Sequence, residues 1–307
     1  MKAIQFSLRA PAPFRLDLTA WVLRRREANR IDSLDATTYR RVMPLGSQIV
    51  TVSVEQEGPA ERPELRVSLF CKSPSSQTGL AARTAITRLL GLNVSLGGFY
   101  AMAQADPHLG PLVERFRGVK PPLYPTLFEA IANAIVFQQI SLDAGISVLN
   151  RLALTYGDVF DCGQRPCYLF PSAHCLAGLR AEEVKKAGMS SNKARALVEC
   201  AQTIIERGLS IDYFEKMDNE SVVAELVKFR GIGRWSADYV LLRGLGRLNV
   251  FPKGDTGARA ALNRWLNPEG RLSDAELKII MSKWRDYAGL IYFHLLLRGL
   301  AEKGVIA

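Results

Sequence analysis

The sequence predicts a mostly α-helical protein in which an all-helical body follows a small N-terminal α+β domain. Its 307 residues are about twice the usual domain size, so we expect two domains with ample core. Apolar and polar residues alternate, as in strands with one solvated face, only in the first ninety-odd residues. Beyond Gly91 the apolar residues recur at helical spacing instead. We therefore predict domains over residues 1–94 and 95–307.

The N-terminal domain combines strands with two helices. Three alternating segments predict strands, at Ile4–Leu8, Val50–Val54 and Leu65–Leu69. Gly58 and Pro59 predict the turn that joins the last two. The segment Leu18–Arg26 predicts a helix, and apolar residues over Ala82–Leu90 form one helical stripe. Strands with helices on one sheet face make an α+β domain.

The C-terminal region carries helix start and stop signals. Thr126 and Glu129 form a predicted capping box just after three prolines, and Ser273 with Glu276 forms a second. Phe128, Ile131 and Ile135 are expected to face inward, and a helix with an apolar side over Leu197–Ile205 ends at Gly208. The last helix runs over Tyr287–Leu300. We expect about eight helices and no strand after Gly91.

Composition narrows the class of protein. Mean hydropathy of +0.02 with 48% apolar residues excludes a disordered chain. No run of eighteen apolar residues exists, so we expect no membrane span, and the N-terminus lacks the apolar region of a signal peptide. Forty Lys and Arg against thirty Asp and Glu give a net charge of +10. This balance favours a nucleic-acid partner, although many soluble proteins are simply basic.

The five cysteines do not predict a disulfide framework, so we expect reduced thiols in a cytoplasmic or nuclear protein. A set of Cys and His residues could suggest zinc, but its spacing fits no tight ligand pattern. The set is Cys162, Cys167, His174 and Cys175. We interpret these as loop and core residues.

A glycine turn between two helices is the most informative motif. An apolar helix runs into Gly231-Ile232-Gly233, and a second helix begins at once. The glycines permit a tight turn with positive φ and expose amides at the next helix N-terminus, which favours anion binding. Such a helix-hairpin-helix grips a DNA phosphate without reading sequence. A lone Gly-x-Gly favours a plain αα-hairpin, and local evidence alone favours a helix N-cap for Asp255, 22 residues past Gly233.

The hairpin with Asp255 at this spacing resembles the HhH-GPD superfamily of DNA glycosylases, and most closely its 3-methyladenine DNA glycosylase II (AlkA-like) branch. Other segments resemble the family too: Phe128-Glu129, Gln138-Gln139-Ile140-Ser141, Gly188-Met189-Ser190 and Trp284-Arg285-Asp286-Tyr287-Ala288. The resemblance covers about residues 96–300. It implies a helix-hairpin-helix glycosylase body with two helical subdomains and a cleft between them.

The resemblance also implies roles for individual residues. Asp255 matches the catalytic aspartate. Gly231, Ile232 and Gly233 match the phosphate-binding hairpin, which in this family often holds Na⁺ or K⁺ at its backbone. Arg230 replaces the family's usual proline and adds a phosphate contact.

Further matched positions concern the base and the duplex. Trp235 and Tyr239 match aromatic positions of the base pocket, to which Phe293 and Arg285 are also assigned. Gln139 lies at the position of the side chain that wedges into the duplex, where the branch also carries Leu.

The chemistry agrees with these assignments. Cutting an N-glycosidic bond develops positive charge on the sugar, which a fixed carboxylate stabilises while it positions or deprotonates water. An alkylated purine is already cationic, so it stacks on aromatic faces and leaves without a general acid. Because a duplex hides the target bond, the nucleotide must flip out, and a wedge such as Gln139 offsets part of that cost.

Two family features are missing. Bifunctional relatives carry a Lys in the helix after the hairpin, where this chain has Trp235, so we expect no strand cleavage by β-elimination. Lys253 is interpreted as a DNA-facing charge. No Cys follows Cys200, so the four-cysteine iron–sulfur cluster of some relatives is absent, and we expect no cofactor.

The sequence thus predicts a monomeric, monofunctional glycosylase for alkylated purines of the 3-methyladenine and 7-methylguanine class. Its partner would be double-stranded DNA with damaged bases, in the nucleoid of a prokaryote or in a nucleus. Two alternatives remain at this point. One is a glycosylase for another lesion, an oxidised or deaminated base. The other is a non-catalytic helix-hairpin-helix DNA-binding protein.

Overall fold

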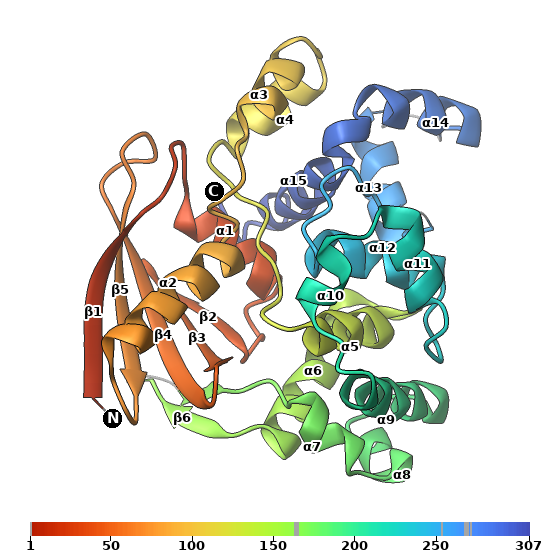
Figure 1. The fold of residues 1–307 in the computed structure, drawn as a ribbon. Coiled ribbons are helices and arrows are strands. Elements are labelled where there is room, and N and C mark those ends of the chain that lie inside the picture. The colour runs from red at the N-terminus through yellow and green to blue at the C-terminus, as the bar shows by residue number, and fades with distance from the viewer. Residues whose placement is uncertain (1, 163–165, 253, 267–269, 271) are drawn as a thin grey trace.

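The computed structural model describes residues 2–162, 166–252, 254–266, 270 and 272–307, with Lys2, Asp274 and Arg285 described by their backbone alone. A sheet at the N-terminus packs beside a helical body, as the sequence predicted (Figure 1). No helix in these ranges has the length and apolar character that a bilayer crossing requires.

The sheet is antiparallel and has five strands in the order β1-β5-β4-β3-β2. The strands are β1 (Lys2–Arg9), β2 (Asp32–Asp35), β3 (Thr38–Leu45), β4 (Gln48–Glu57) and β5 (Glu64–Cys71). Helix α2 (Ser76–Leu89) covers one face (Figure 1), and α1 (Leu16–Arg24) joins the sheet to the body. The three predicted strands and both helices are confirmed. Strands β2 and β3 were not predicted, because β3 buries Tyr39, Arg41, Val42 and Met43 and so lacks alternation.

The body contains thirteen α-helices within the described residues, more than the eight or so expected. They are α3 (Gly97–Gln104), α4 (Leu109–Arg115), α5 (Leu127–Phe137), α6 (Leu142–Tyr156), α7 (Ala173–Ala177), α8 (Ala181–Lys185), α9 (Ser191–Glu206), α10 (Ile211–Glu215), α11 (Asn219–Leu226), α12 (Arg234–Arg243), α13 (Thr256–Leu266), α14 (Asp274–Lys283) and α15 (Ala288–Ala301). A 3-10 turn, η1 (Arg285–Tyr287), precedes the last helix. The short helices α7, α8 and α10 hold too few residues to show a period.

Two expectations about the body are wrong. A small hairpin, β6 (Val159–Asp161) with β7 (Pro166–Tyr168), lies within the helical region. Its three-residue strands are too short for alternation to be seen. Cys162, directly after β6, and Cys167 of β7 form a disulfide with Cα atoms 5.8 Å apart, whereas we expected reduced thiols. Cys71, Cys175 and Cys200 are free.

Helix α1 contributes to two hydrophobic cores at once. Leu16, Ala20 and Leu23 pack into the core of the sheet domain. Leu18 and Trp21 pack instead with the helices of the body, α15 among them. Because both faces of α1 are buried, the sheet domain is fixed against the body. The boundary near residue 94 stays a prediction.

A buried ionic cluster adds to this joint. Glu129 does not complete the capping box predicted with Thr126, although the Thr126 hydroxyl does accept from the Glu129 amide at 3.1 Å. The Glu129 carboxylate binds Arg41 of β3 instead. Arg41 also donates to Asp32 at 2.5 Å, and Tyr39 donates to the same carboxylate at 2.7 Å. Burial raises the pKa of Glu129, an effect that Arg41 opposes. The capping box at Ser273 is confirmed with both of its hydrogen bonds.

His294, inside α15, makes the stability of the protein depend on pH. The ring is 1% exposed, and burial lowers the pKa of His294 to about 4. Between pH 6.5 and 4 the unfolded chain takes up a proton that the folded chain refuses, so stability falls as the pH falls. Relative to His294→Gln, wild type should lose about 3 kcal/mol of unfolding free energy across this range. Urea titrations of both proteins at pH 7.5 and 4.5 measure the difference. An equal loss in the two proteins would contradict the assignment to His294.

Candidate active site

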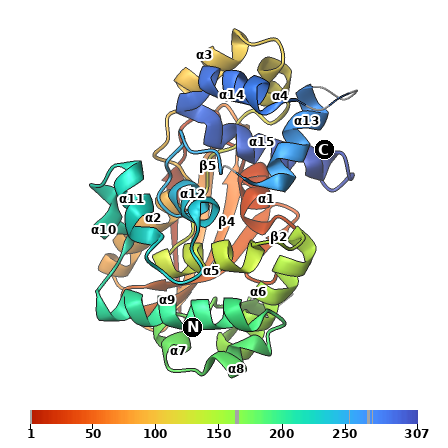
Figure 2. The same cartoon turned by 90° about the vertical axis from the view of Figure 1, so that its right-hand side faces the viewer.

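The described structure contains a large cavity between helices that are far apart in the sequence. Its volume is about 1060 Å³. The lining comes from the end of α1, the loop between α5 and α6, the start of α12, the segment around Asp255, and α15. Helix α12 lies between α5 and α15 (Figure 2). The cavity therefore brings the hairpin and Asp255 to one place.

The hairpin turn forms as predicted at its first glycine. Gly231 has a φ of +76°, and a Cβ there would lie 2.9 Å from the Ala196 methyl group of α9. Gly233 is extended, at a φ of −102°, so only one of the two glycines needs a positive φ. The first amides of α12 have no intrahelical partners, as in any helix, and the N-cap residue Gly233 has no side chain to accept from them. These amides are available to a phosphate oxygen.

The loop between α5 and α6 braces the hairpin. The Gln138 amide donates to the Gly231 carbonyl at 2.7 Å and to the Ser236 hydroxyl at 2.8 Å. The Gly231 carbonyl thus offers a monovalent cation only its second lone pair, and such a cation stays a prediction. Ile232 is 6% exposed and anchors the turn in the core. Arg230 lies at the surface, where its Nη1 is 3.6 Å from Glu199 Oε1.

The Asp255 carboxylate has two separate sets of partners. Oδ1 accepts from the Ala258 amide at 2.8 Å, which is the N-cap geometry considered from the sequence. Oδ2 accepts from the Trp235 indole at 3.2 Å and from the Tyr292 hydroxyl at 3.0 Å. Asp255 also lines the cavity. One oxygen therefore anchors the group to α13, whose N-terminus favours negative charge, while side chains orient the other.

Aromatic rings form a wall beside Asp255. Trp235 and Tyr239 lie with ring centroids 5.6 Å apart, and both line the cavity together with Tyr292. Burial raises the pKa of Tyr292, and the Asp255 carboxylate raises it further. Tyr292 therefore stays protonated and donates to Asp255.

The structure places Phe293 elsewhere than the sequence suggested. Its side chain is 1% exposed and does not line the cavity, and the Arg243 guanidinium lies 5.4 Å from its ring centroid. The neighbouring Tyr292 lines the cavity instead. The sequence could not distinguish the two residues, because α15 is apolar on almost all of its sides. Arg285 lies in η1, with its side chain outside the described part. Lys253 lies outside the described residues.

Gln139 stands on the rim of the cavity. It is exposed and has a φ of +54°, one of three non-glycine residues with positive φ among those described. Such a backbone conformation costs about 1 kcal/mol and is typical of functional loops. The placement is compatible with a wedge, and that role stays a prediction.

Sequence reasoning missed Arg25 and Phe137. A run of arginines such as Arg24–Arg26 usually lies on a solvated helix face, but Arg24 is 8% and Arg25 4% exposed. The Arg25 guanidinium enters the cavity wall, where it lies 4.4 Å from the Phe137 ring centroid and donates to the Tyr239 hydroxyl at 3.1 Å. No local pattern could have found this residue, since the docking of the sheet domain on the body positions it.

Comparison with known proteins agrees with this geometry. Residues 132–286 match the family described as HhH-GPD superfamily base excision DNA repair protein. A DNA-3-methyladenine glycosylase of Bacillus subtilis is 28% identical over 204 residues, which are 66% of this chain and 67% of that protein.

Solved structures resemble the whole fold. The 3-methyladenine DNA-glycosylase of Archaeoglobus fulgidus superposes with a TM-score of 0.81 at 26% identity, over 95% of this chain and 97% of that one. An 8-oxoguanine glycosylase/lyase of Clostridium acetobutylicum, in complex with double-stranded DNA, shares the fold with a TM-score of 0.73 at 16% identity, over 98% of both chains. The family match covers half of the chain and includes the hairpin and Asp255. The chain therefore belongs to the HhH-GPD superfamily of base excision DNA repair proteins.

Proposed function

We propose that this protein is a monofunctional DNA glycosylase that releases alkylated purines, of the 3-methyladenine and 7-methylguanine class, from duplex DNA. The observation that carries the proposal is the Asp255 carboxylate, held by Trp235 and Tyr292 in an aromatic cavity. The names of the Bacillus and Archaeoglobus relatives support the lesion class. The reaction would begin base excision repair by leaving an abasic site.

In this proposal Asp255 acts on the sugar. As the N-glycosidic bond breaks, positive charge develops on the deoxyribose, and the nearby carboxylate stabilises it. Three donors fix the carboxylate, so little reorganisation is needed in the transition state. The same group positions or deprotonates the attacking water. The flipped base would stack on Trp235 and Tyr239.

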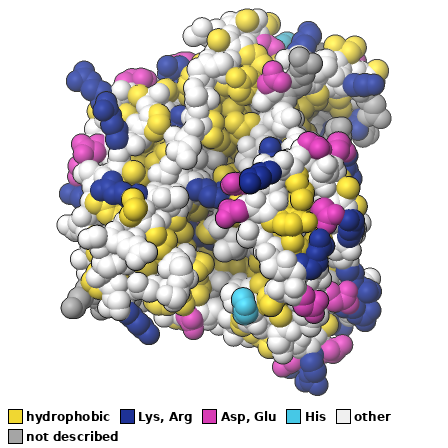
Figure 3. All heavy atoms as spheres, viewed as in Figure 1, with side chains coloured by type: hydrophobic (Ala, Val, Ile, Leu, Met, Phe, Trp, Pro, Cys, Tyr) yellow, Lys and Arg dark blue, Asp and Glu magenta, His cyan; other side chains and the backbone are white. Residues whose placement is uncertain are grey.

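Binding to DNA would use the backbone of the hairpin. On the one face that Figure 3 draws, Lys and Arg side chains are interspersed with Asp and Glu, so that face carries no single charged patch. The first amides of α12 would bind one phosphate, and the net charge of +10 would favour the duplex generally. We propose a monomer, with Gln139 entering the stack that the flipped base leaves.

The test is base release from a methylated duplex, with borohydride trapping alongside. Wild-type protein should release free 7-methylguanine and 3-methyladenine and give no covalent adduct, because Trp235 occupies the position of the Schiff-base lysine in bifunctional relatives. A trapped adduct would contradict the monofunctional assignment, with Lys253 the first residue to replace. Tight DNA binding without release of either purine would overturn the proposed activity.

A further inference from the structure

We propose that Arg25 is a specificity-determining residue of the base cavity. Its guanidinium favours uncharged bases with a hydrogen-bond acceptor and disfavours cationic alkylated bases. The inference rests on the proposed glycosylase function and deepens it. Arg25 comes from the sheet domain, immediately after α1, and lines the cavity described above. That domain would thus contribute to the choice of lesion as well as to stability.

The backbone at Arg25 holds an unfavourable conformation. Arg25 has a φ of +60° and caps α1, its amide donating to the Trp21 carbonyl at 2.8 Å. Glycine is the usual residue at such a left-handed cap, and another residue costs about 1 kcal/mol. A glycine would adopt this positive φ at a lower cost but would not supply a guanidinium to the cavity. The conformation therefore indicates that the side chain has a use.

The guanidinium carries five N–H donors, and two of them bind protein acceptors. Nη1 donates to the Tyr239 hydroxyl at 3.1 Å, and Nη2 donates to the side-chain amide oxygen Oδ1 of Asn133 at 2.8 Å. Nε is buried and has no partner in the described structure. That nitrogen is closed off from the cavity, so an acceptor atom of a bound base would take the second N–H of Nη1 or Nη2, each of which carries two. Phe137 covers the guanidinium at 4.4 Å and helps to fix its plane.

The charge of Arg25 is not neutralised by direct contact. Its hydrogen-bond partners in the described chain are a hydroxyl and an amide, whereas the neighbouring Arg26 pairs with Asp143 at 2.7 Å. Asp255 is the only acidic residue among those that line the cavity in the described ranges. A cationic base in this cavity therefore meets the like charge of a guanidinium that no carboxylate contacts directly, and a neutral base does not.

The test compares two lesions in the same duplex sequence. Single-turnover rates of release are measured for 7-methylguanine, which is cationic in DNA, and for hypoxanthine, a neutral purine with a carbonyl acceptor. Arg25→Gln should raise the ratio of 7-methylguanine to hypoxanthine release by about tenfold, because the repulsion disappears and the neutral base loses a donor. Arg25→Lys keeps the charge and should leave the ratio much nearer to that of wild type.

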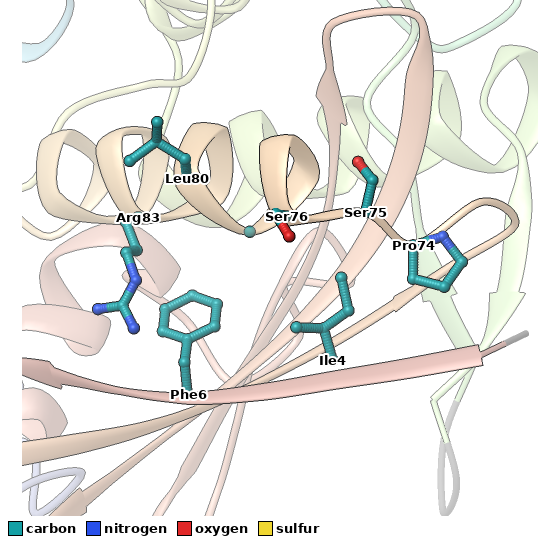
Figure 4. Close-up of a pocket in the computed structure, with 8 residues that line it drawn as sticks. Ile4, Phe6, Pro74, Ser75, Ser76, Leu80 and Arg83 are labelled. Atoms are coloured by element: carbon teal, nitrogen blue, oxygen red, sulfur yellow. The ribbon is translucent and has the colours of Figure 1, made fainter.

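A charge-matched control separates this effect from net charge. Arg83 of α2 lies beside the edge strand β1, with its guanidinium 4.3 Å from the Phe6 ring centroid (Figure 4). It is not among the residues that line the base cavity. Arg83→Gln makes the same change in net charge and should not alter the ratio.

The outcomes distinguish the inference from the function on which it rests. Parallel slowing of both lesions by Arg25→Gln, with unchanged thermal unfolding, would mean that Arg25 only braces Tyr239 and Asn133, and would overturn the inference. A higher ratio in Arg25→Lys as well would overturn the charge argument. Failure of wild type to release either base would instead refute the proposed glycosylase activity.

Discussion

Asp255→Asn is expected to slow the release of 7-methylguanine from duplex DNA by about 10³-fold or more while leaving DNA binding within a few-fold. The substitution keeps a side-chain oxygen for the Ala258 amide, so the start of α13 should stay intact. It removes the negative charge that stabilises the developing oxocarbenium ion. Single-turnover rates, together with binding to an undamaged duplex, measure the two effects separately.

A matched control makes the same chemical change at another helix cap. Asp218 caps α11 through the Ser221 amide at 2.8 Å and lies at the surface, outside the cavity lining. Asp218→Asn should leave base release within about twofold of wild type, since Asn caps a helix nearly as well as Asp. A loss in Asp255→Asn no greater than in this control would mean that Asp255 serves only as a cap, as in the non-catalytic alternative.

The parts of the site that could be predicted are those that one stretch of sequence encodes. The turn at Gly231 requires a residue that tolerates positive φ, and the sequence shows glycine there. Asp255 could be placed near the hairpin only through the family resemblance, because its spacing alone equally fits a helix cap.

The parts that could not be predicted depend on contacts between distant segments. Arg25 meets Tyr239, 214 residues further along the chain, only when the sheet domain has docked. Within α15 the side that faces the cavity, with Tyr292, and the side buried in the core, with Phe293, look alike in the sequence, since most of that helix is apolar. In β3 the charged Arg41 is buried, so the strand does not show the usual alternation of apolar and polar residues. Arg41 can be buried because it pairs with Glu129 of α5, a residue distant in the sequence.

The second large effect concerns the buried ionic cluster between the sheet domain and the helical body. Arg41→Met should lower the free energy of unfolding by about 3–5 kcal/mol at pH 7.5, because it leaves two buried carboxylates without their counter-ion. Arg41, Asp32 and Glu129 are 1%, 3% and 4% exposed, so water cannot replace the lost partner. Glu129→Gln is the matched comparison. It keeps a hydrogen-bond acceptor for Arg41 and leaves Asp32 as the single counter-ion, so its cost should be no more than about 1 kcal/mol.

The pH dependence of Arg41→Met tests the cause of the loss. Burial raises the pKa of Glu129, and removal of Arg41 should raise it further, so the folded variant would hold a proton that the unfolded chain releases. Its stability relative to wild type should therefore recover as the pH falls from 8 to 5, which urea unfolding at both values would show. A pH-independent loss would point to lost packing instead.

The same cluster is connected to the cavity, since the Glu129 backbone carbonyl accepts from the Asn133 side chain at 2.9 Å and Asn133 in turn accepts from Arg25. Disturbing the joint should thus also alter the preference between cationic and neutral lesions.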